Sequence, residues 1–446
     1  MKRSVIAALV LLLCSIPAWA DEEPMKRVFP YETHRHTLEN GLTVILVPMP
    51  SDGLVAYWSI VRTGSRDEYE TGRTGFAHFF EHMMFQGTEA YPQAEYNAVV
   101  TKMGADANAY TTDDLTAYHM GITVEDLEQT IKIESDRFQN LAYSEGDFRT
   151  EAGAVYGEYR KNRTNPFFAL YEAMCEEAYG THTYGHTTMG YEKDIKAMPE
   201  MFEYSQSFFA RYYRPENVVL FIAGDIEPQA TLKMIETHYG AWSPGYVQPK
   251  IQAEPEQKAE RHVEVKYDGQ SLPILWVAYK ADRFDPAGKQ GVALSLLADL
   301  AFGETSPIHK KLVLDEQLVE FIAADAGMNR DPGLLDIYTR VKDPAKIDYV
   351  LAEIDKVVER YRQNPPEAQR LADLKSRLRY SFLMNLDTPD RVASSLARIV
   401  AITGGIEAVD ELYETYSTIT PEDVQGAAKH YLVPARRTVG TLKGGR

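Results

Sequence analysis

Residues 75–88 read Gly-Phe-Ala-His-Phe-Phe-Glu-His-Met-Met-Phe-Gln-Gly-Thr, and this stretch decides how the rest of the sequence is interpreted. Apolar residues recur at helical spacing over about 75–85, which predicts a helix. His78 and His82 are one turn apart on that helix, so both imidazoles can reach a single ion. Glu81 follows His78 by three residues and is therefore close enough to lie beside the same ion.

The spacing His-x-x-Glu-His is that of a catalytic zinc site with a carboxylate as general base. Zinc lowers the pKa of a bound water to about 7, and a nearby carboxylate can accept its proton as the water attacks a carbonyl. The alternative is a pair of surface histidines on an amphipathic helix. Phe76, Phe79, Phe80 and Met83 argue against it, because they predict a largely buried helix on which histidines need partners.

A third ligand must come from elsewhere, since a catalytic zinc has three protein ligands and one open position. Residues 147–161 read as an amphipathic helix that carries Glu151 and Glu158 two turns apart on one face. Two solvated glutamates on a charged helix are the more common situation, so spacing alone leaves their role open. We expect His34, His36, His182 and His186 to be loop or structural histidines.

Strand and helix signals alternate around this motif. Asn40-Gly41 between two short alternating runs predicts a β-hairpin over 36–48. Further strands are expected at 56–61 and 218–223, and a further helix at 125–142. Long helices mixed with several strands predict an α+β fold, in which helices pack on mainly antiparallel sheets.

The chain divides near its midpoint. Residues 244–262 contain three prolines among Gln, Glu and Lys without periodicity, which is typical of a linker. We therefore predict a zinc-binding catalytic domain over 21–243 and a second domain, without the zinc motif, over 263–446. Tyr212-Tyr213-Arg214-Pro215 is echoed by Tyr431-Leu432-Val433-Pro434, and the spacing of about half the chain indicates two related, duplicated halves.

The first twenty residues have the features of a signal peptide. A basic start precedes the apolar run 5–13, and Ala18-Trp19-Ala20 is a cleavage pattern. A buried N-terminal helix is the alternative. Cys14 follows three leucines and lacks the small residue typical of lipoprotein sites. If the signal peptide is removed, Cys14 is lost with it. Cys175 is then the single cysteine and cannot form an intramolecular disulfide. We expect a periplasmic protein.

Charge and hydropathy argue against nucleic-acid binding and against a membrane anchor. The sequence has 47 basic and 65 acidic residues and a formal net charge of −18, which argues against non-specific binding of nucleic acid. No stretch after the signal peptide is apolar and long enough to span a bilayer, so no membrane anchor is expected.

The sequence around the histidines closely resembles the active-site segment of the pitrilysin/insulinase family of zinc peptidases. The resemblance is dense over the first half and loose over the second. The matching stretches are Leu38 to Leu42, Gly64 to Glu68, Gly75 to Thr88, Asn108 to Thr111, Glu151, Glu158, His182 to Gly185 and Tyr213 to Asn217.

The resemblance implies roles for the glutamates. Glu158, 76 residues past His82, takes the position of the third zinc ligand, beside His78 and His82. Glu81 is the general base, and Glu151 is a second catalytic-site glutamate that supports the centre. One Zn²⁺ per chain is expected.

The resemblance also implies how a substrate binds. Half-length members of the family pair as dimers, and four related domains then enclose a chamber for an unfolded peptide. The peptide adds as a strand to a sheet edge near the zinc. The edge strand is matched here by Ala107, Asn108, Ala109 and Tyr110.

One departure from the family concerns the substrate clamp. Active members carry an arginine and, seven residues later, a tyrosine that hold the substrate and the developing oxyanion. The best local match, Leu312 to Glu320, has Val313 and Glu320 at these positions. We therefore expect a heterodimer whose second family subunit supplies this pair, with a homodimer as the fallback.

The sequence thus predicts a zinc endopeptidase that acts on peptides or unfolded segments. The alternative is a non-catalytic peptide-binding or assembly subunit of the same family. A metal-storage or sensor protein is disfavoured, because no other ligands cluster in the sequence.

Overall fold

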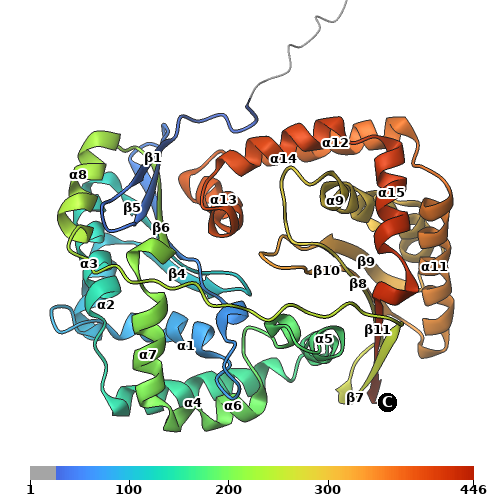
Figure 1. Ribbon diagram of the computed structural model, residues 1–446, viewed down its shortest axis with the longest axis horizontal. Helices are drawn as coiled ribbons and strands as arrows, with labels where there is room; N and C mark the ends of the chain where they lie inside the picture. The colour runs from blue at the N-terminus through green and yellow to red at the C-terminus, as the bar shows by residue number, and fades with distance from the viewer. Residues whose placement is uncertain (1–26, 446) are drawn as a thin grey trace, which may run out of the picture.

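The computed structural model describes residues 27–445, so the predicted signal peptide over 1–20 lies outside the described residues. Two sheets form the framework (Figure 1), with strand orders β1-β2-β6-β3-β5-β4 and β7-β11-β8-β10-β9. Their bounds are β1 His34–Thr37, β2 Thr43–Pro48, β3 Leu54–Val61, β4 Asp106–Thr111, β5 Thr116–Thr123, β6 Val218–Gly224, β7 Arg261–Gln270, β8 Ile274–Lys280, β9 Val319–Ala326, β10 Leu334–Val341 and β11 Arg437–Gly445.

The helices fill the space around these sheets. The predicted helices over 75–85, 125–142 and 147–161 appear as α1, α3 and α4, and the predicted hairpin as β1 and β2. The bounds are α1 Phe76–Met83, α2 Gln93–Met103, α3 Leu127–Asn140, α4 Glu145–Asn162, α5 Pro166–Ala178, α6 Glu192–Ala197, α7 Phe202–Tyr212, α8 Pro228–Tyr239, α9 Lys289–Phe302, α10 Pro307–His309, α11 Ile347–Gln363, α12 Ala368–Met384, α13 Pro389–Thr403, α14 Glu407–Thr418 and α15 Pro421–Tyr431.

The two halves share one topology. β6 pairs parallel with β2 and antiparallel with β3, and β11 pairs in the same way with β7 and β8. Each of these strands follows a helix and a short turn that begins at Pro215 or Pro434. The prediction of an α+β fold with two related halves is therefore confirmed.

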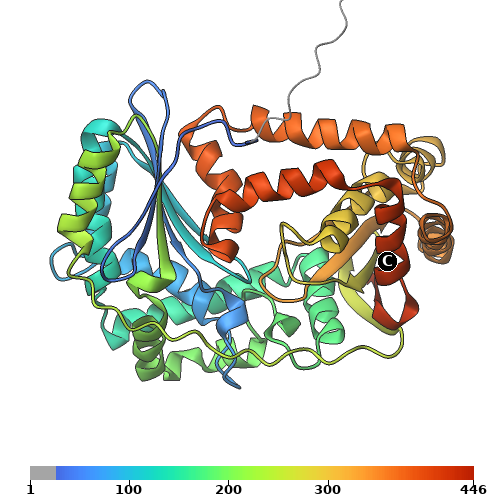
Figure 2. The ribbon, with the colours of Figure 1, turned by 45° about the horizontal axis from the view of Figure 1, so that its top comes forward.

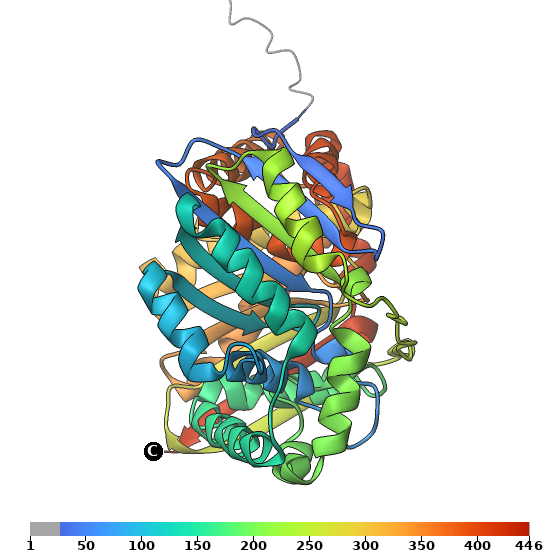
Figure 3. The same ribbon diagram turned by 90° about the vertical axis from the view of Figure 1, so that its left-hand side faces the viewer.

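One face of the first sheet packs on helices of its own half. α2, α3 and α8 lie over the strands when this half is viewed from its outer side (Figure 3). α1 and α7 belong to the same apolar core, in which Phe76, Phe80 and Phe208 lie against sheet residues such as Tyr118. The zinc-motif helix is thus fixed by the core of the first half.

The opposite face of the first sheet packs on α13, which belongs to the second half (Figure 2). Trp58 and Phe221 of the sheet share a buried cluster with Leu396 and Val400 of α13. α13 leads into α14 through a 93° bend. Within residues 27–445 no single helix is long and apolar enough to cross a membrane, and α13 and α14 meet that test only when taken together.

The second sheet is covered in the reciprocal way. Helices of its own half, including α9, α11 and α15, pack on one face. α5 of the first half packs on the other, where Leu170 and Met174 meet Ile274 and Leu442. Gly440 of β11 permits this approach, because a Cβ there would lie 2.3 Å from the sulfur of Met174. Each half therefore supplies a helix to the sheet of the other.

Candidate metal centre

The side chains of His78, His82 and Glu158 converge where α1 meets α4. Oε2 of Glu158 lies 3.6 Å from Nε2 of His78 and 3.4 Å from Nε2 of His82. Two ligands at zinc-binding distance in a tetrahedral site are about 3.4 Å apart. The separations and the two-nitrogen, one-oxygen donor set therefore fit zinc. Among residues 27–445 no other group of His, Cys, Asp and Glu converges in this way.

The packing of α1 explains why the histidines point toward α4. Phe76, Phe79 and Phe80 of α1 are fully buried in the core of the first half. The opposite side of this helix carries His78, which is 7% exposed, and His82, which is half-buried. Surface histidines, the alternative left by the sequence, therefore do not describe this helix.

Glu151 orients His82 rather than joining the converging atoms. Its Oε1 lies 2.8 Å from Nδ1 of His82, and its Oε2 accepts a hydrogen bond from Nε2 of Gln86 at 3.2 Å. A proton on Nδ1 leaves Nε2 of His82 free to coordinate an ion. Gln86 was not singled out from the sequence, and it lies four residues beyond His82 in the 3-10 turn Met84–Gln86 that follows α1.

The electrostatics of the cluster favour a cation. Burial lowers the pKa of His78 to about 4, which keeps this imidazole neutral and ready to coordinate. Hydrogen bonds to Glu151 and Glu158 raise the pKa of His82 to about 10. The hydrogen bond from His82 holds the pKa of Glu158 below its usual value. A metal ion would replace the proton on Nε2 of His82 that Glu158 attracts, while the Nδ1 proton that faces Glu151 would stay.

Glu81 faces a separate partner on the edge strand. Oγ1 of Thr111 donates to its Oε2 at 2.6 Å. Burial raises the pKa of Glu81, and the bond from Thr111 opposes this rise. A carboxylate with a raised pKa is better suited to accept a proton near neutral pH.

Two hollows meet at Glu81. The larger, about 430 Å³, is lined by His78, Glu158, Tyr110 and Thr111 together with residues of α5 and the segment 187–189. The smaller, about 280 Å³, is lined by His82, Glu151, Asn108 and Ala109, with Phe85, Gln86 and Gln93. The general-base candidate thus lies between two spaces that flank the converging ligand atoms.

β4 lies at the edge of the first sheet and contains Ala107, Asn108, Ala109 and Tyr110. In the described sheet it pairs with β5 alone. The amide of Ala109 donates to Oδ1 of Asn108 at 2.8 Å, so it points toward the unpaired edge. The ring of Tyr110 packs edge-on against Trp58, with ring centroids 6.2 Å apart.

Neither residue at the expected clamp positions offers a hydrogen-bond donor. Val313 is half-buried in a π-helical segment over Lys310–Asp315. Glu320 lies on β9, the edge strand of the second sheet, where its carboxylate accepts from Arg340 at 3.2 Å. The negative charge at the position expected for the tyrosine is therefore paired with an arginine.

A chain of two related halves whose first half presents a His-x-x-Glu-His ligand set has the form of an inverzincin. Residues 43–192 match the family model described as Insulinase (Peptidase family M16), and residues 203–378 match Peptidase M16 inactive domain. The chain therefore belongs to peptidase family M16, which confirms the resemblance seen in the sequence.

Relatives of similar length include a protein named as a zinc protease and a subunit of a peptidase. The zinc protease PqqE of Helicobacter pylori is 25% identical over 413 residues, which cover 91% of this chain and 92% of that protein. The β subunit of the mitochondrial-processing peptidase of Bos taurus is 25% identical over 430 residues, covering 92% of this chain and 85% of the subunit.

Solved structures share the fold. A protease from Helicobacter pylori matches with a TM-score of 0.87 at 24% identity, covering 93% of this chain and 100% of that one. Pitrilysin matches with a TM-score of 0.75 at 20% identity, covering 93% of this chain and 45% of pitrilysin. The present chain therefore spans about half the length of pitrilysin.

Proposed function

We propose that this chain is the catalytic subunit of a zinc endopeptidase that hydrolyses peptides or unfolded polypeptide segments. The observation that carries the proposal is the convergence of His78, His82 and Glu158 next to Glu81, between two hollows that open beside the unpaired edge of β4. Names of relatives as zinc proteases support the same class of reaction.

A substrate would bind as an additional strand on β4. Its backbone would displace Oδ1 of Asn108 from the amide of Ala109 and pair with it instead. An antiparallel peptide runs opposite to β4, so its N-terminal part lies toward Thr111 and the larger hollow. Its C-terminal part lies toward Asn108 and the smaller hollow.

Zinc held by His78, His82 and Glu158 would supply Lewis acidity, which polarises the carbonyl and acidifies water. Glu81 removes a proton from the attacking water as its oxygen bonds to the scissile carbonyl carbon. Glu81 then returns this proton to the nitrogen of the leaving amine, and the carbon–nitrogen bond breaks. Glu151 keeps His82 in the coordinating tautomer throughout.

Zinc content and cleavage together test this proposal. We expect about one zinc per wild-type chain, lost in Glu158→Gln, and cleavage of unstructured peptides by the active assembly. A chain that binds peptides and holds zinc but never cleaves them, with any family partner, would support the alternative of a binding or assembly subunit. Rapid cleavage of compact folded proteins, with short peptides left intact, would contradict the substrate class.

We propose further that a second family subunit supplies the donors that Val313 and Glu320 cannot provide. Loss of one oxyanion donor can reduce a rate by about 10²–10³. The isolated chain should therefore bind zinc and cleave slowly, and addition of the partner should raise the rate. The β subunit of the mitochondrial-processing peptidase, by its name one subunit of a larger enzyme, offers a precedent. Full activity of the isolated chain would contradict the heterodimer.

We also propose that the protein works in the periplasm, on the basis of the basic start, apolar run and Ala18-Trp19-Ala20 pattern. Cell fractionation and N-terminal sequencing of the mature protein test this. A chain recovered from the cytoplasm with residues 1–20 intact would contradict it.

A further inference from the structure

The segment Gly64–Glu68 plays no part in the proposed reaction, yet it holds the helix that carries the metal ligands. Oε2 of Glu68 accepts a hydrogen bond from the amide of Gly75 at 2.7 Å, and Oε1 accepts one from Ala77 at 2.7 Å. Glu68 is 3% exposed. Amides at a helix start have no partner within the helix, and a carboxylate there is favoured by the helix dipole. Glu68 therefore caps α1.

The cap has to come from outside the helix. Gly75, the N-cap residue of α1, has φ +91°, and a Cβ there would lie 2.7 Å from the backbone oxygen of Met189. A serine, threonine or aspartate at this position would clash, so local capping is impossible. Burial raises the pKa of Glu68, while its two amide donors favour the ionised form.

Glu68 is itself fixed by a turn that rests on the end of β4. The 3-10 turn Ser65–Asp67 docks through the amide of Arg66, which donates to the backbone oxygen of Asp113 at 2.9 Å. A Cβ on Gly64 would lie 2.2 Å from the backbone oxygen of Thr112. The turn thus lies next to Thr111, the partner of Glu81, and one segment supports both the metal helix and the edge strand.

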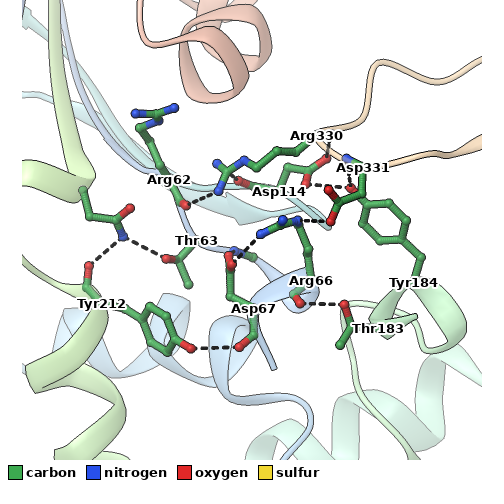
Figure 4. Close-up of polar contacts among 12 residues, drawn as sticks. Arg62, Thr63, Arg66, Asp67, Asp114, Thr183, Tyr184, Tyr212, Arg330 and Asp331 are labelled. Carbon is green, nitrogen blue, oxygen red and sulfur yellow. Dashed lines mark hydrogen bonds and ion pairs between the residues drawn. The ribbon is translucent and has the colours of Figure 1, made fainter. Parts of the chain in front are cut away.

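The second half of the chain holds this turn from the other side. Nε of Arg66 donates to Oδ2 of Asp331 at 2.6 Å, and Asp331 lies in the loop between β9 and β10 (Figure 4). Arg66 is 5% exposed, and its NH1 also donates to Asp67 at 3.0 Å. Nδ1 of His182 accepts from the amide of Tyr184, so its Nε2 carries the proton and donates to Asp331 at 3.0 Å.

Hydrogen bonds between backbone and side-chain groups hold the β9–β10 loop against the first half. The amide of Asp331 donates to the hydroxyl of Tyr184 at 3.2 Å, and this hydroxyl donates to Oδ1 of Asp114 at 2.8 Å. Arg330 donates to the backbone oxygens of Arg62 at 3.1 Å and Asp114 at 3.2 Å (Figure 4). The β9–β10 loop is therefore held by residues of the first half outside the turn that Asp331 contacts.

We propose that Glu68 is a positioning residue for the metal centre, and that the Arg66–Asp331 ion pair makes zinc affinity in the first half depend on the second half. This inference rests on the proposed zinc site. Its physical basis is that the ligand atoms lie 3.4 and 3.6 Å apart, close to the spacing a tetrahedral ion requires. A shift of the first turn of α1 moves His78 relative to Glu158 and weakens coordination.

The test measures zinc affinity by competition with a fluorescent chelator, and hydrogen exchange of α1 amides in the metal-free chain. Outer partners of metal ligands typically change affinity by about 10–100-fold. We expect a loss of this size in Glu68→Gln, with faster exchange of the first turn of α1. Asp331→Asn should act in the same direction by about tenfold. The double variant should lose less than the product of the two effects, because both act through one turn.

Matched control variants separate the positioning of α1 from a general loss of stability. Glu227 caps α8 by accepting from the amides of Gln229 and Ala230, so Glu227→Gln removes an equivalent cap elsewhere. Asp299 pairs with Arg377 within the second half, so Asp299→Asn matches Asp331→Asn. Both controls should keep wild-type zinc affinity. If Asp331→Asn does not fold, Arg66→Lys replaces it, since lysine keeps the charge but cannot form both arginine bonds.

Folded Glu68→Gln and Asp331→Asn proteins with wild-type zinc affinity and wild-type exchange would overturn the inference. Failure of the proposed function gives a different result: the wild-type chain would bind no zinc, or Glu158→Gln would bind it as well as the wild type. The two outcomes are therefore distinguishable in one set of titrations.

Discussion

Thr111 and Glu81 are joined by a hydrogen bond of 2.6 Å that links the edge strand β4 to α1, the helix of the proposed metal ligands His78 and His82. The carboxylate proposed as general base is therefore oriented by the strand proposed to receive the peptide. A substrate that shifts β4 would also shift Glu81, so the proposed docking and proton transfer would be coupled through this contact.

Removal of the Thr111 hydroxyl should change the pH dependence of peptide cleavage. The bond from Thr111 stabilises the ionised form of Glu81 and opposes the rise in pKa that burial causes. Thr111→Val should therefore raise the pKa of Glu81 further. Since the base must be ionised, the acidic limb of the pH profile of kcat/KM should move to higher pH. Thr111→Ser, which keeps the hydroxyl, should retain the wild-type profile, and an identical profile in the valine variant would contradict the assigned contact.

Substitution of the base itself should separate metal binding from chemistry. Glu81→Gln keeps the shape of the side chain and removes its basicity. We expect zinc to be retained and peptide cleavage to fall by about 10²–10⁴. Metal analysis and peptide assays on one preparation check this. Turnover near the wild-type rate with zinc bound would rule out Glu81 as the base.

Substitution of Glu151 should change zinc affinity and should not remove the base that transfers the proton. It holds Nδ1 of His82 at 2.8 Å, so Glu151→Gln removes a charged partner that fixes the coordinating tautomer. We expect zinc affinity to fall by about 10–100-fold. Glu145, exposed on the same helix and paired with Arg149, provides the control Glu145→Gln. Equal zinc affinities of the two variants would show that Glu151 does not support the centre.

Asp331 should contribute to stability in a pH-dependent way. Burial alone would raise its pKa, but hydrogen bonds from His182 and Arg66 outweigh this effect and hold the pKa well below its usual value. The stabilisation from a lowered pKa in the folded state is fully present above the unfolded value of about 3.9, and it is lost progressively as the pH falls from there through the lower pKa of the folded state.

Urea unfolding of Asp331→Asn should therefore show a loss of about 2 kcal/mol at pH 7. The difference from wild type should shrink when both proteins are measured near pH 3, where the carboxylate is protonated in the unfolded chain. A difference of equal size at both pH values would show that the ionised carboxylate is not the cause.

Local spacing explains what the sequence could predict. His78 and His82 lie one turn apart, and the aromatic residues between them define the buried side of the same helix, so the helix and the shared face follow from the pattern. Glu151 and Glu158 likewise lie on one face of a predicted helix, but their spacing alone could not show which of them binds the ion. The structure separates them, because Glu158 alone approaches Nε2 of both histidines.

Contacts between distant segments could not be predicted from spacing or periodicity. Arg66 and Asp331 are 265 residues apart, and nothing in either segment indicates the other. The same holds for Thr111, whose partner Glu81 lies on another element. The amphipathic pattern of α5 and α13 shows that each has an apolar face, but periodicity contains no information about which sheet that face covers.

The exchange of α5 and α13 between the halves determines what counts as a folding unit. A fragment that ends in the 244–262 segment would retain α5 with Leu170 and Met174 bare, and its sheet would lack the cover of Leu396 and Val400. The complementary fragment would lack α5 in turn. Neither half can therefore bury both faces of its sheet without the other half. Two separately expressed pieces would therefore recover the fold only by associating with each other.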